Sequence, residues 1–144
     1  MQLTSKGRYA VMAMADLSAR GRDRAVTVAE IATRQGISAA YLEQLLARLR
    51  RAGLVEAARG PGGGYRLARA AEEVSVAQVI AAVDERIATT RCKPGAKLGC
   101  TGKAERCLTH NLWAALNLKI NEFLSGVSLK DVAEGRVSVA EFAA

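Results

Sequence analysis

The chain has 144 residues, which favours a single compact domain, and half of them are hydrophobic, so a core can form. Aromatic residues make up only 4% and alanine is abundant, which predicts an aliphatic, mainly helical protein. No apolar run reaches the roughly 18 residues of a membrane span, and residues 1–20 lack the apolar region of a secretory signal. We therefore expect a cytoplasmic protein without a membrane partner.

The net charge of +7 is unevenly distributed. Residues 1–66 hold 11 Lys and Arg against 5 Asp and Glu, a balance of +6, whereas residues 67–144 hold 10 against 9, a balance of +1. A basic half beside a nearly neutral half indicates a polyanion-binding module, although a charged surface that only confers solubility is the commoner origin of such a charge.

Residues 5–52 predict three helices. The first runs from Ser5 to Arg20, where apolar residues recur at helical spacing. Thr27 and Glu30 have the spacing of a capping box at the start of the second, and Gly36 can end it. Ser38 can cap a third helix that reaches about Ala52. Two short helices joined by a tight turn form a helix-turn-helix, and the alternative is an ordinary helical hairpin.

The next segment favours the DNA-binding interpretation. Residues 54–57 and 65–67 predict two short strands, and the glycine-rich stretch Arg59–Gly64 joins them. A hairpin directly after a helix-turn-helix is the wing of a winged helix, whose Arg59 can enter a narrow minor groove. The stretch lacks the Lys-Ser/Thr pair of a nucleotide-binding loop, and the remaining alternative is a flexible turn.

The second half predicts a connecting helix, a loop and a long helix. Ser75 caps a helix that ends near Ala88, and a loop covers Thr89 to Arg106. An apolar stripe then follows helical spacing and stops at Gly126, so it is a candidate dimerisation helix or a simple core helix; its members are Leu108, Leu112, Leu116, Ile120, Phe123 and Leu124. A short helix and a tail complete the chain from Ser128 to Ala144.

We therefore predict a mainly α protein: a winged helix-turn-helix with a small two-stranded wing and a long C-terminal dimerisation helix. Its expected parts are a DNA-binding domain at 1–70, a connecting helix at 71–90, a cysteine-containing loop at 91–110, and the dimerisation helix and tail at 111–144.

Three cysteines in a chain expected to be cytoplasmic favour metal binding or redox chemistry over a disulfide framework. Cys92, Cys100, Cys107 and His110, the single histidine, lie within nineteen residues and are candidate ligands. The loop is basic and rich in glycine, which suits thiolate ligands around an inorganic centre. The spacing leaves an iron–sulfur cluster, a zinc ion and free redox thiols open.

Several motifs together resemble the IscR family of iron–sulfur cluster regulators, over nearly the whole chain. They are Leu3–Val11, Gly36–Ser38, Tyr41–Leu45, Arg59–Tyr65, Val83–Glu85, Thr90–Cys92 and Cys107–His110. The set separates the chain from the nitric-oxide-sensing NsrR relatives better than a winged helix alone does.

The resemblance implies a homodimeric regulator that binds promoter DNA, is not an enzyme and senses iron–sulfur status to control cluster-biogenesis genes. It implies a [2Fe–2S] cluster on Cys92, Cys100, Cys107 and His110, received from cluster-assembly proteins. Nitric oxide or redox sensing, and a zinc or thiol regulator, are the alternatives. The DNA-contacting positions implied are Ser38, Tyr41, Glu43, Gln44 and Arg59. The basic end of the recognition helix adds candidate phosphate contacts at Arg48, Arg50 and Arg51.

Overall fold

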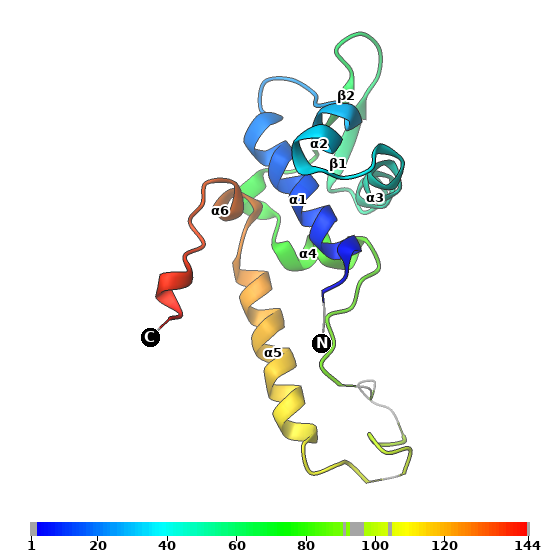
Figure 1. The fold of residues 1–144 in the computed structure, drawn as a ribbon, viewed down its shortest axis with the longest axis vertical. Coiled ribbons are helices and arrows are strands. Elements are labelled where there is room, and N and C mark those ends of the chain that lie inside the picture. The colour runs from blue at the N-terminus through cyan, green and yellow to red at the C-terminus, as the bar shows by residue number, and fades with distance from the viewer. Residues whose placement is uncertain (1–2, 91, 93–96, 104, 144) are drawn as a thin grey trace.

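The computed structural model describes residues 3–90, 92, 97–103 and 105–143, so the predicted loop at 91–110 is described only in part and its Arg91 lies outside. The elements in chain order are α1 (Ser5–Arg20), α2 (Val28–Gln35), α3 (Ala39–Arg51), β1 (Val55–Ala58), β2 (Gly64–Leu67), the 3-10 helix η1 (Ala71–Glu73), α4 (Val76–Ala82), α5 (His110–Gly126), α6 (Leu129–Ala133) and the 3-10 helix η2 (Val139–Glu141). The predicted mainly α winged helix-turn-helix is confirmed, and α5 extends away from its head (Figure 1).

The predicted helix caps are present. The Thr27 hydroxyl accepts from the Glu30 N–H at 3.2 Å, and the Glu30 carboxylate accepts from the Thr27 N–H at 2.8 Å. Hydrogen bonds from Arg24 and then from Thr27 lower the pKa of Glu30 to about 2. Gly36 ends α2 in the left-handed region at φ 65°, and the Ser38 hydroxyl accepts from the Tyr41 N–H at 3.1 Å. These local bonds fix the turn between α2 and α3.

The wing is an antiparallel hairpin in which Val55 pairs with Leu67 and Ala58 with Gly64. Both strands include one residue beyond the predicted ones, at Ala58 and Gly64. Tyr65 also exchanges two backbone hydrogen bonds with Val26, at 2.7 and 2.8 Å, which joins the wing to the segment before α2. A Cβ at Gly64 would lie 2.4 Å from the Val26 carbonyl oxygen, so only glycine permits this approach.

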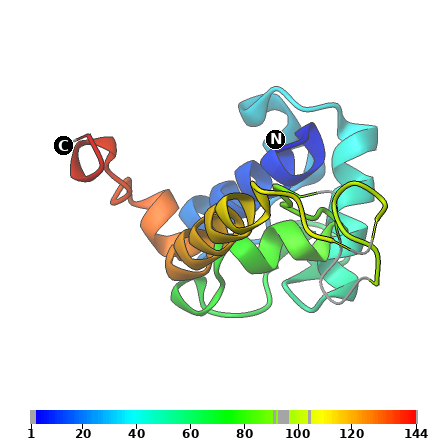
Figure 2. The ribbon, with the colours of Figure 1, turned by 90° about the horizontal axis from the view of Figure 1, so that it is seen from below.

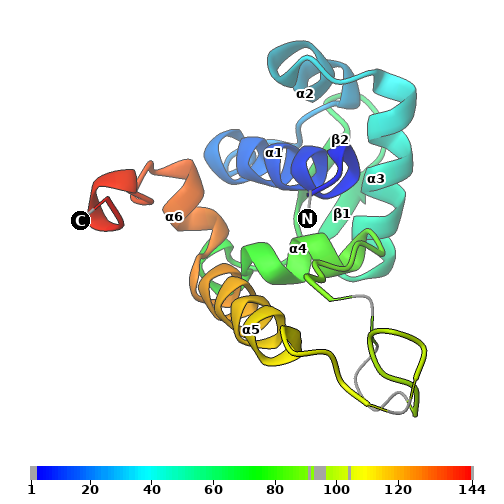
Figure 3. The ribbon, with the colours of Figure 1, turned by 60° about the horizontal axis from the view of Figure 1, so that its bottom comes forward.

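The core is aliphatic and α1 lies at its centre. This helix packs against α2, α3, α4, α6 and β2 (Figure 3). Leu129 of α6 is fully buried in the same core as Val79 of α4, so the elements on both sides of the long loop close over one hydrophobic centre. The core members on α1 and α3 are Ala10, Ala13, Met14, Leu17, Leu42, Leu45, Leu46 and Leu49. The predicted domain boundary at residue 70 stays a prediction.

The prediction that the connecting helix reaches about Ala88 is wrong, because α4 ends at Ala82. The apolar face formed by Val76, Val79 and Ile80 is completed by the buried Val83. Asp84 then has a positive φ of 58°, and a right-handed helix cannot continue through this backbone conformation. The following residues form an irregular segment that leads to Cys92.

The long helix begins at His110, two residues later than the stripe suggested, and Leu108 is fully exposed before it. Figure 2 shows α5 running beside α4 below the head. None of the residues of α5, all of them described, is buried in the single chain. Among the described residues, no helix combines the length and hydrophobicity that crossing a membrane would take.

One buried acid connects the first two helices. The Asp16 side chain is 1% exposed and accepts two hydrogen bonds from Arg34, at 2.7 and 2.9 Å, and one from Gln35 at 2.8 Å. Burial opposes its ionisation, but these hydrogen bonds and the positive charge of Arg34 outweigh that effect and lower the pKa of Asp16. The interaction fixes the last turn of α2 on α1.

We expect Asp16→Asn to lower the free energy of unfolding by about 3 kcal/mol at pH 7, because it leaves Arg34 without its carboxylate. Since the pKa of Asp16 is lowered on folding, its contribution is present above the unfolded pKa of about 3.9 and disappears as the pH falls through the folded value. Urea denaturation at several pH values measures both effects. The exposed Asp23→Asn is the matched control, and an equal loss in both variants would contradict the assignment.

Candidate metal centre and nucleic-acid interface

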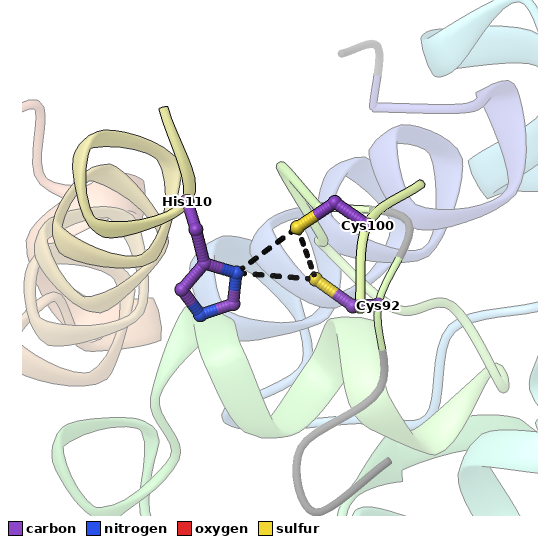
Figure 4. Close-up of side chains that lie close together, drawn as sticks. All are labelled: Cys92, Cys100 and His110. Atoms are coloured by element: carbon purple, nitrogen blue, oxygen red, sulfur yellow. Dashed lines mark hydrogen bonds between the residues drawn. The ribbon is translucent and has the colours of Figure 1, made fainter. Parts of the chain in front are cut away.

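Three of the four predicted ligands converge (Figure 4). The Cys92 and Cys100 sulfurs are 3.4 Å apart, and the Nδ1 atom of His110 lies 3.4 Å from the first and 3.2 Å from the second. All three side chains are half-buried. The fourth predicted ligand, Cys107, is not in this group, because its sulfur contacts the Thr109 hydroxyl at 3.6 Å.

Separate segments supply these three side chains. His110 is the first residue of α5, whereas Cys92 and Cys100 come from the loop before it. The Thr89 hydroxyl donates to the Trp113 carbonyl oxygen at 2.6 Å and holds the start of the loop against α5. The N-terminal end of a helix carries partial positive charge, so its position here favours thiolates and an anionic centre.

The donor set fits a thiophilic metal centre. Two thiolates on one tetrahedral metal with bonds of about 2.3 Å lie roughly 3.8 Å apart, close to the separation of Cys92 and Cys100. Thiolates with an imidazole suit zinc and iron–sulfur centres and do not suit magnesium or calcium. The same three side chains could therefore ligate a single ion or supply ligands to a cluster.

The outer face of α3 carries most of the predicted DNA contacts. Ser38, Glu43, Gln44, Arg50 and Arg51 are exposed, and the leucines of the opposite face are buried. Helical spacing places Glu43 and Gln44 one to two turns before Arg50 and Arg51, so they form one continuous strip. A side-chain strip of this kind is what a recognition helix presents to the major groove.

Two predicted contacts have partners within the protein. Tyr41 is half-buried and packs edge-on against Tyr9 of α1, with ring centroids 6.1 Å apart. Arg48 donates to Asp84 at 2.5 Å and is directed to α4. Its predicted phosphate contact stays a prediction and competes with this ion pair.

The wing presents Arg59 at its exposed tip. A turn closes the tip through a hydrogen bond from the Gly63 N–H to the Gly60 carbonyl oxygen at 2.9 Å. The other arginine of the hairpin, Arg66 of β2, pairs across the strands with Glu56 at 3.0 Å. Arg59 is thus the arginine of the hairpin that is placed for a groove.

Sequence reasoning gave no role to Thr89 and Asp84, although the structure places both beside predicted functional residues. Their contacts join residues 24 and 36 positions apart, so no local spacing indicates them. The available signal was only that Asp84 lies within the Val83–Glu85 motif, and Thr89 beside the Thr90–Cys92 motif, of the resemblance to the IscR family.

Comparison with known proteins identifies the family. The model of the Rrf2 family, described as an iron-dependent transcriptional regulator, matches residues 3–135. The chain belongs to the Rrf2 family. A regulator of this family controls transcription and is not an enzyme. Membership of this family implies DNA binding, for which the exposed faces of α3 and of the wing are the candidate surface.

Relatives named HTH-type transcriptional regulator IscR are similar over most of their length. The protein of Aliivibrio salmonicida is 52% identical over 132 residues, which cover 92% of this chain and 77% of that protein. The one of Xenorhabdus nematophila is 52% identical over 136 residues, covering 94% and 81%. The resemblance to the IscR family is confirmed.

Solved structures share the fold. T. potens IscR has a TM-score of 0.73 and 32% identity, and the match covers all of this chain and 97% of that one. CymR, the global cysteine regulator of B. subtilis, has a TM-score of 0.79 and 27% identity, covering 93% and 97%. The winged helix and the extended α5 are thus features that this Rrf2 chain shares with known regulators.

We expect the double substitution Arg50→Ala and Arg51→Ala to weaken DNA binding at every sequence and to reduce the dependence of log K on log salt by about one per arginine. Fluorescence anisotropy with a promoter duplex and a scrambled duplex, from low to high salt, measures this slope. Arg136→Ala, far from α3, should leave the slope unchanged. An unchanged slope in the double variant would place the phosphate contacts elsewhere.

Proposed function

We propose that this Rrf2 protein is an IscR-type regulator that holds a [2Fe–2S] cluster through Cys92, Cys100, Cys107 and His110. By reporting iron–sulfur status it would control cluster-biogenesis genes. The observation that carries the proposal is the convergence of two cysteines and the single histidine at the start of α5, within 3.4 Å of one another. The names of the relatives and the iron-dependent family description support it.

The assignment of Cys107 as the remaining ligand rests on its proximity along the chain. It lies three residues before His110, and the His110 N–H donates to its carbonyl oxygen at 3.1 Å. Its present partner is only the Thr109 hydroxyl, a weak interaction. A rotation about its side chain costs little compared with gaining a metal–thiolate bond.

Two other centres use the same side chains and are the alternatives. A zinc ion suits the short separation of the three ligand atoms. A nitric-oxide or redox sensor, or a thiol regulator, would use the reactivity of the same exposed loop. The cluster is favoured because the relatives that match over most of the chain carry the IscR name.

When bound, the cluster would supply an oxidation- and assembly-sensitive centre. The protein's own residues would recognise the DNA. The helix α3 would enter the major groove, where Glu43 would contact bases and Arg50 and Arg51 would contact phosphates. Arg59 would enter the minor groove. Ser38, Tyr41, Gln44 and Arg48 complete the proposed contacts. We place this activity in the cytoplasm, where promoter DNA and cluster-assembly donor proteins occur.

We also propose a homodimer formed through α5. Leu112 and Phe123 are 59% and 43% exposed, and helical spacing puts them on one face with Leu116 and Ile120. A helix with such a face is costly to leave in water. In the described chain it packs against α4, and Phe123 also packs edge-on against Phe142, with ring centroids 5.5 Å apart, yet Leu112 and Phe123 stay exposed. Two copies would cover the face and present two recognition helices to paired half-sites.

Anaerobically purified protein should be coloured, with visible absorption that disappears in Cys92→Ala, Cys100→Ala and His110→Ala. Zinc has a filled d shell, so a zinc protein would be colourless. Absorption spectra with iron, zinc and sulfide analysis make the measurement. Thr109→Ala, which removes the side-chain partner of Cys107 but no proposed ligand, is the control and should keep its colour. Full colour in the cysteine variants would refute the ligand set.

Leu112→Glu should convert the dimer to a monomer, because it puts a charge in the proposed apolar interface. Leu118→Glu is the matched control, since Leu118 is 71% exposed and lies on the other side of α5. Sedimentation velocity gives the mass of each. A wild-type chain that sediments as a monomer, or a dimer that persists in Leu112→Glu, contradicts the proposed interface.

A further inference from the structure

Two adjacent acids follow α4, and each holds a different helix of the head. The Asp84 carboxylate accepts from Arg48 of α3 at 2.5 Å. The Glu85 carboxylate accepts from the Thr4 N–H, at the start of α1, at 2.6 Å. The bonds span 36 and 81 positions of the sequence. The turn after α4 is therefore tied at once to the recognition helix and to the central helix.

The contact of Glu85 completes a cap that α1 lacks. In α2, α4 and α6 the third helical residue is Glu30, Gln78 or Asp131, and its side chain accepts from the N-cap N–H. In α1 the same position is Gly7, the N-cap is Thr4, and the first turn has no acidic residue. Glu85, which lies 81 positions later in the sequence, provides the carboxylate that accepts from the Thr4 N–H.

The fit between Glu85 and Gly7 is steric as well as electrostatic. A Cβ at Gly7 would lie 2.0 Å from Glu85 Oε2, so the carboxylate occupies the space that a side chain would fill. Burial opposes its ionisation, but hydrogen bonding from Thr4 and the positive charge of Lys6 outweigh this and lower the pKa of Glu85. The acid is thus held charged over the first turn of α1.

The backbone at this turn is set by Asp84. Among the described residues it is the one non-glycine residue with positive φ, at 58°. Aspartate tolerates this region better than most residues. Val83 before it is fully buried, which anchors the turn in the core.

The same turn begins the segment that leads to the metal centre. Cys92 lies seven positions after Glu85, so a fully extended chain limits their separation to roughly 25 Å. Thr89 within this segment is bonded to α5, and Glu85 and Cys92 line one cavity with Asn117 of α5. The segment that carries Cys92 is therefore short, and it is close to Glu85 through the shared cavity and to α5 through Thr89.

We propose that Asp84 and Glu85 act as a clamp that couples the Cys92 loop to the orientation of the recognition helix, Glu85 by capping α1 across the fold and Asp84 by holding Arg48. Both are positioning residues. The part of the proposal that concerns DNA affinity rests on the proposed function, whereas the mechanical link between the loop, α1 and α3 does not.

The decisive experiment moves the carboxylate that caps α1 from position 85 to position 7. Glu85→Ala removes the half of the clamp that holds α1, and Gly7→Glu combined with Glu85→Ala restores a capping box within α1 but leaves α1 unconnected to the loop. The Glu85 carboxylate atoms that crowd position 7 are absent in this background, and the next nearest atom belongs to the flexible Leu3 side chain, at 3.2 Å. Glu72→Gln, at an exposed acid, is the control.

Hydrogen exchange of the metal-free full chain tests whether the loop, α1 and α3 are mechanically linked. Glu85→Ala should speed exchange in the first turn of α1 and in the last turn of α3, and the double variant should restore protection in α1 but not in α3. Glu85→Gln, which keeps an acceptor, covers the case in which Glu85→Ala fails to fold, and it should show the same pattern more weakly. If α3 is unaffected, or recovers with α1, Glu85 is only a local cap and the clamp is refuted.

A comparison of DNA affinity with and without the cluster tests whether the clamp couples the cluster to DNA binding. The wild-type ratio of affinities for a promoter duplex should differ from one by at least about fivefold. It should approach one in the double variant, with the visible absorption retained. A wild-type ratio of one would overturn the proposed sensing function alone, since the exchange data still decide the clamp. An unchanged ratio in the double variant would overturn the clamp alone.

Discussion

The close packing of α1 in the centre of the head is the constraint on which the other elements depend. Ala10 and Ala13 are fully buried, and their small side chains let neighbouring helices approach the backbone of α1. Met14 and Leu17 fill the remaining space in the same core. Because α2, α3, α4 and α6 all pack against this one helix, its position sets where the recognition helix lies relative to the rest.

Polar contacts at the surface of this core give α1 a defined rotation and position. Asp16 fixes α2 near the C-terminal end of α1, and Glu85 caps the N-terminal end. Each involves a charged group that is costly to leave unpaired, so each specifies one arrangement among several that the apolar residues alone would tolerate. The head is thus both held together by aliphatic packing and oriented by a few carboxylates.

The candidate metal centre is built differently from the head. The three side chains that converge lie on an irregular loop and on the first residue of α5, and they are half-buried outside the hydrophobic core of the described residues. Such a site has few contacts of its own to resist change. A rigid DNA-binding head joined by a short tether to a weakly held ligand loop is the arrangement that a sensor needs, because ligand binding can then bias the loop without unfolding the head.

The sequence by itself determined the helix-turn-helix, the wing, the outer face of α3 and the ligand types. These features depend on interactions within a few residues, such as the Thr27–Glu30 cap and the helical spacing of the leucines, so spacing alone predicts them. Only the tertiary structure decided that α4 stops at Ala82, that Cys92 and Cys100 meet His110 while Cys107 lies outside that group, and that Glu85 fills the place left by Gly7. The physical reason is that these contacts join distant parts of the chain, and their geometry follows from how the helices pack and not from local residue order.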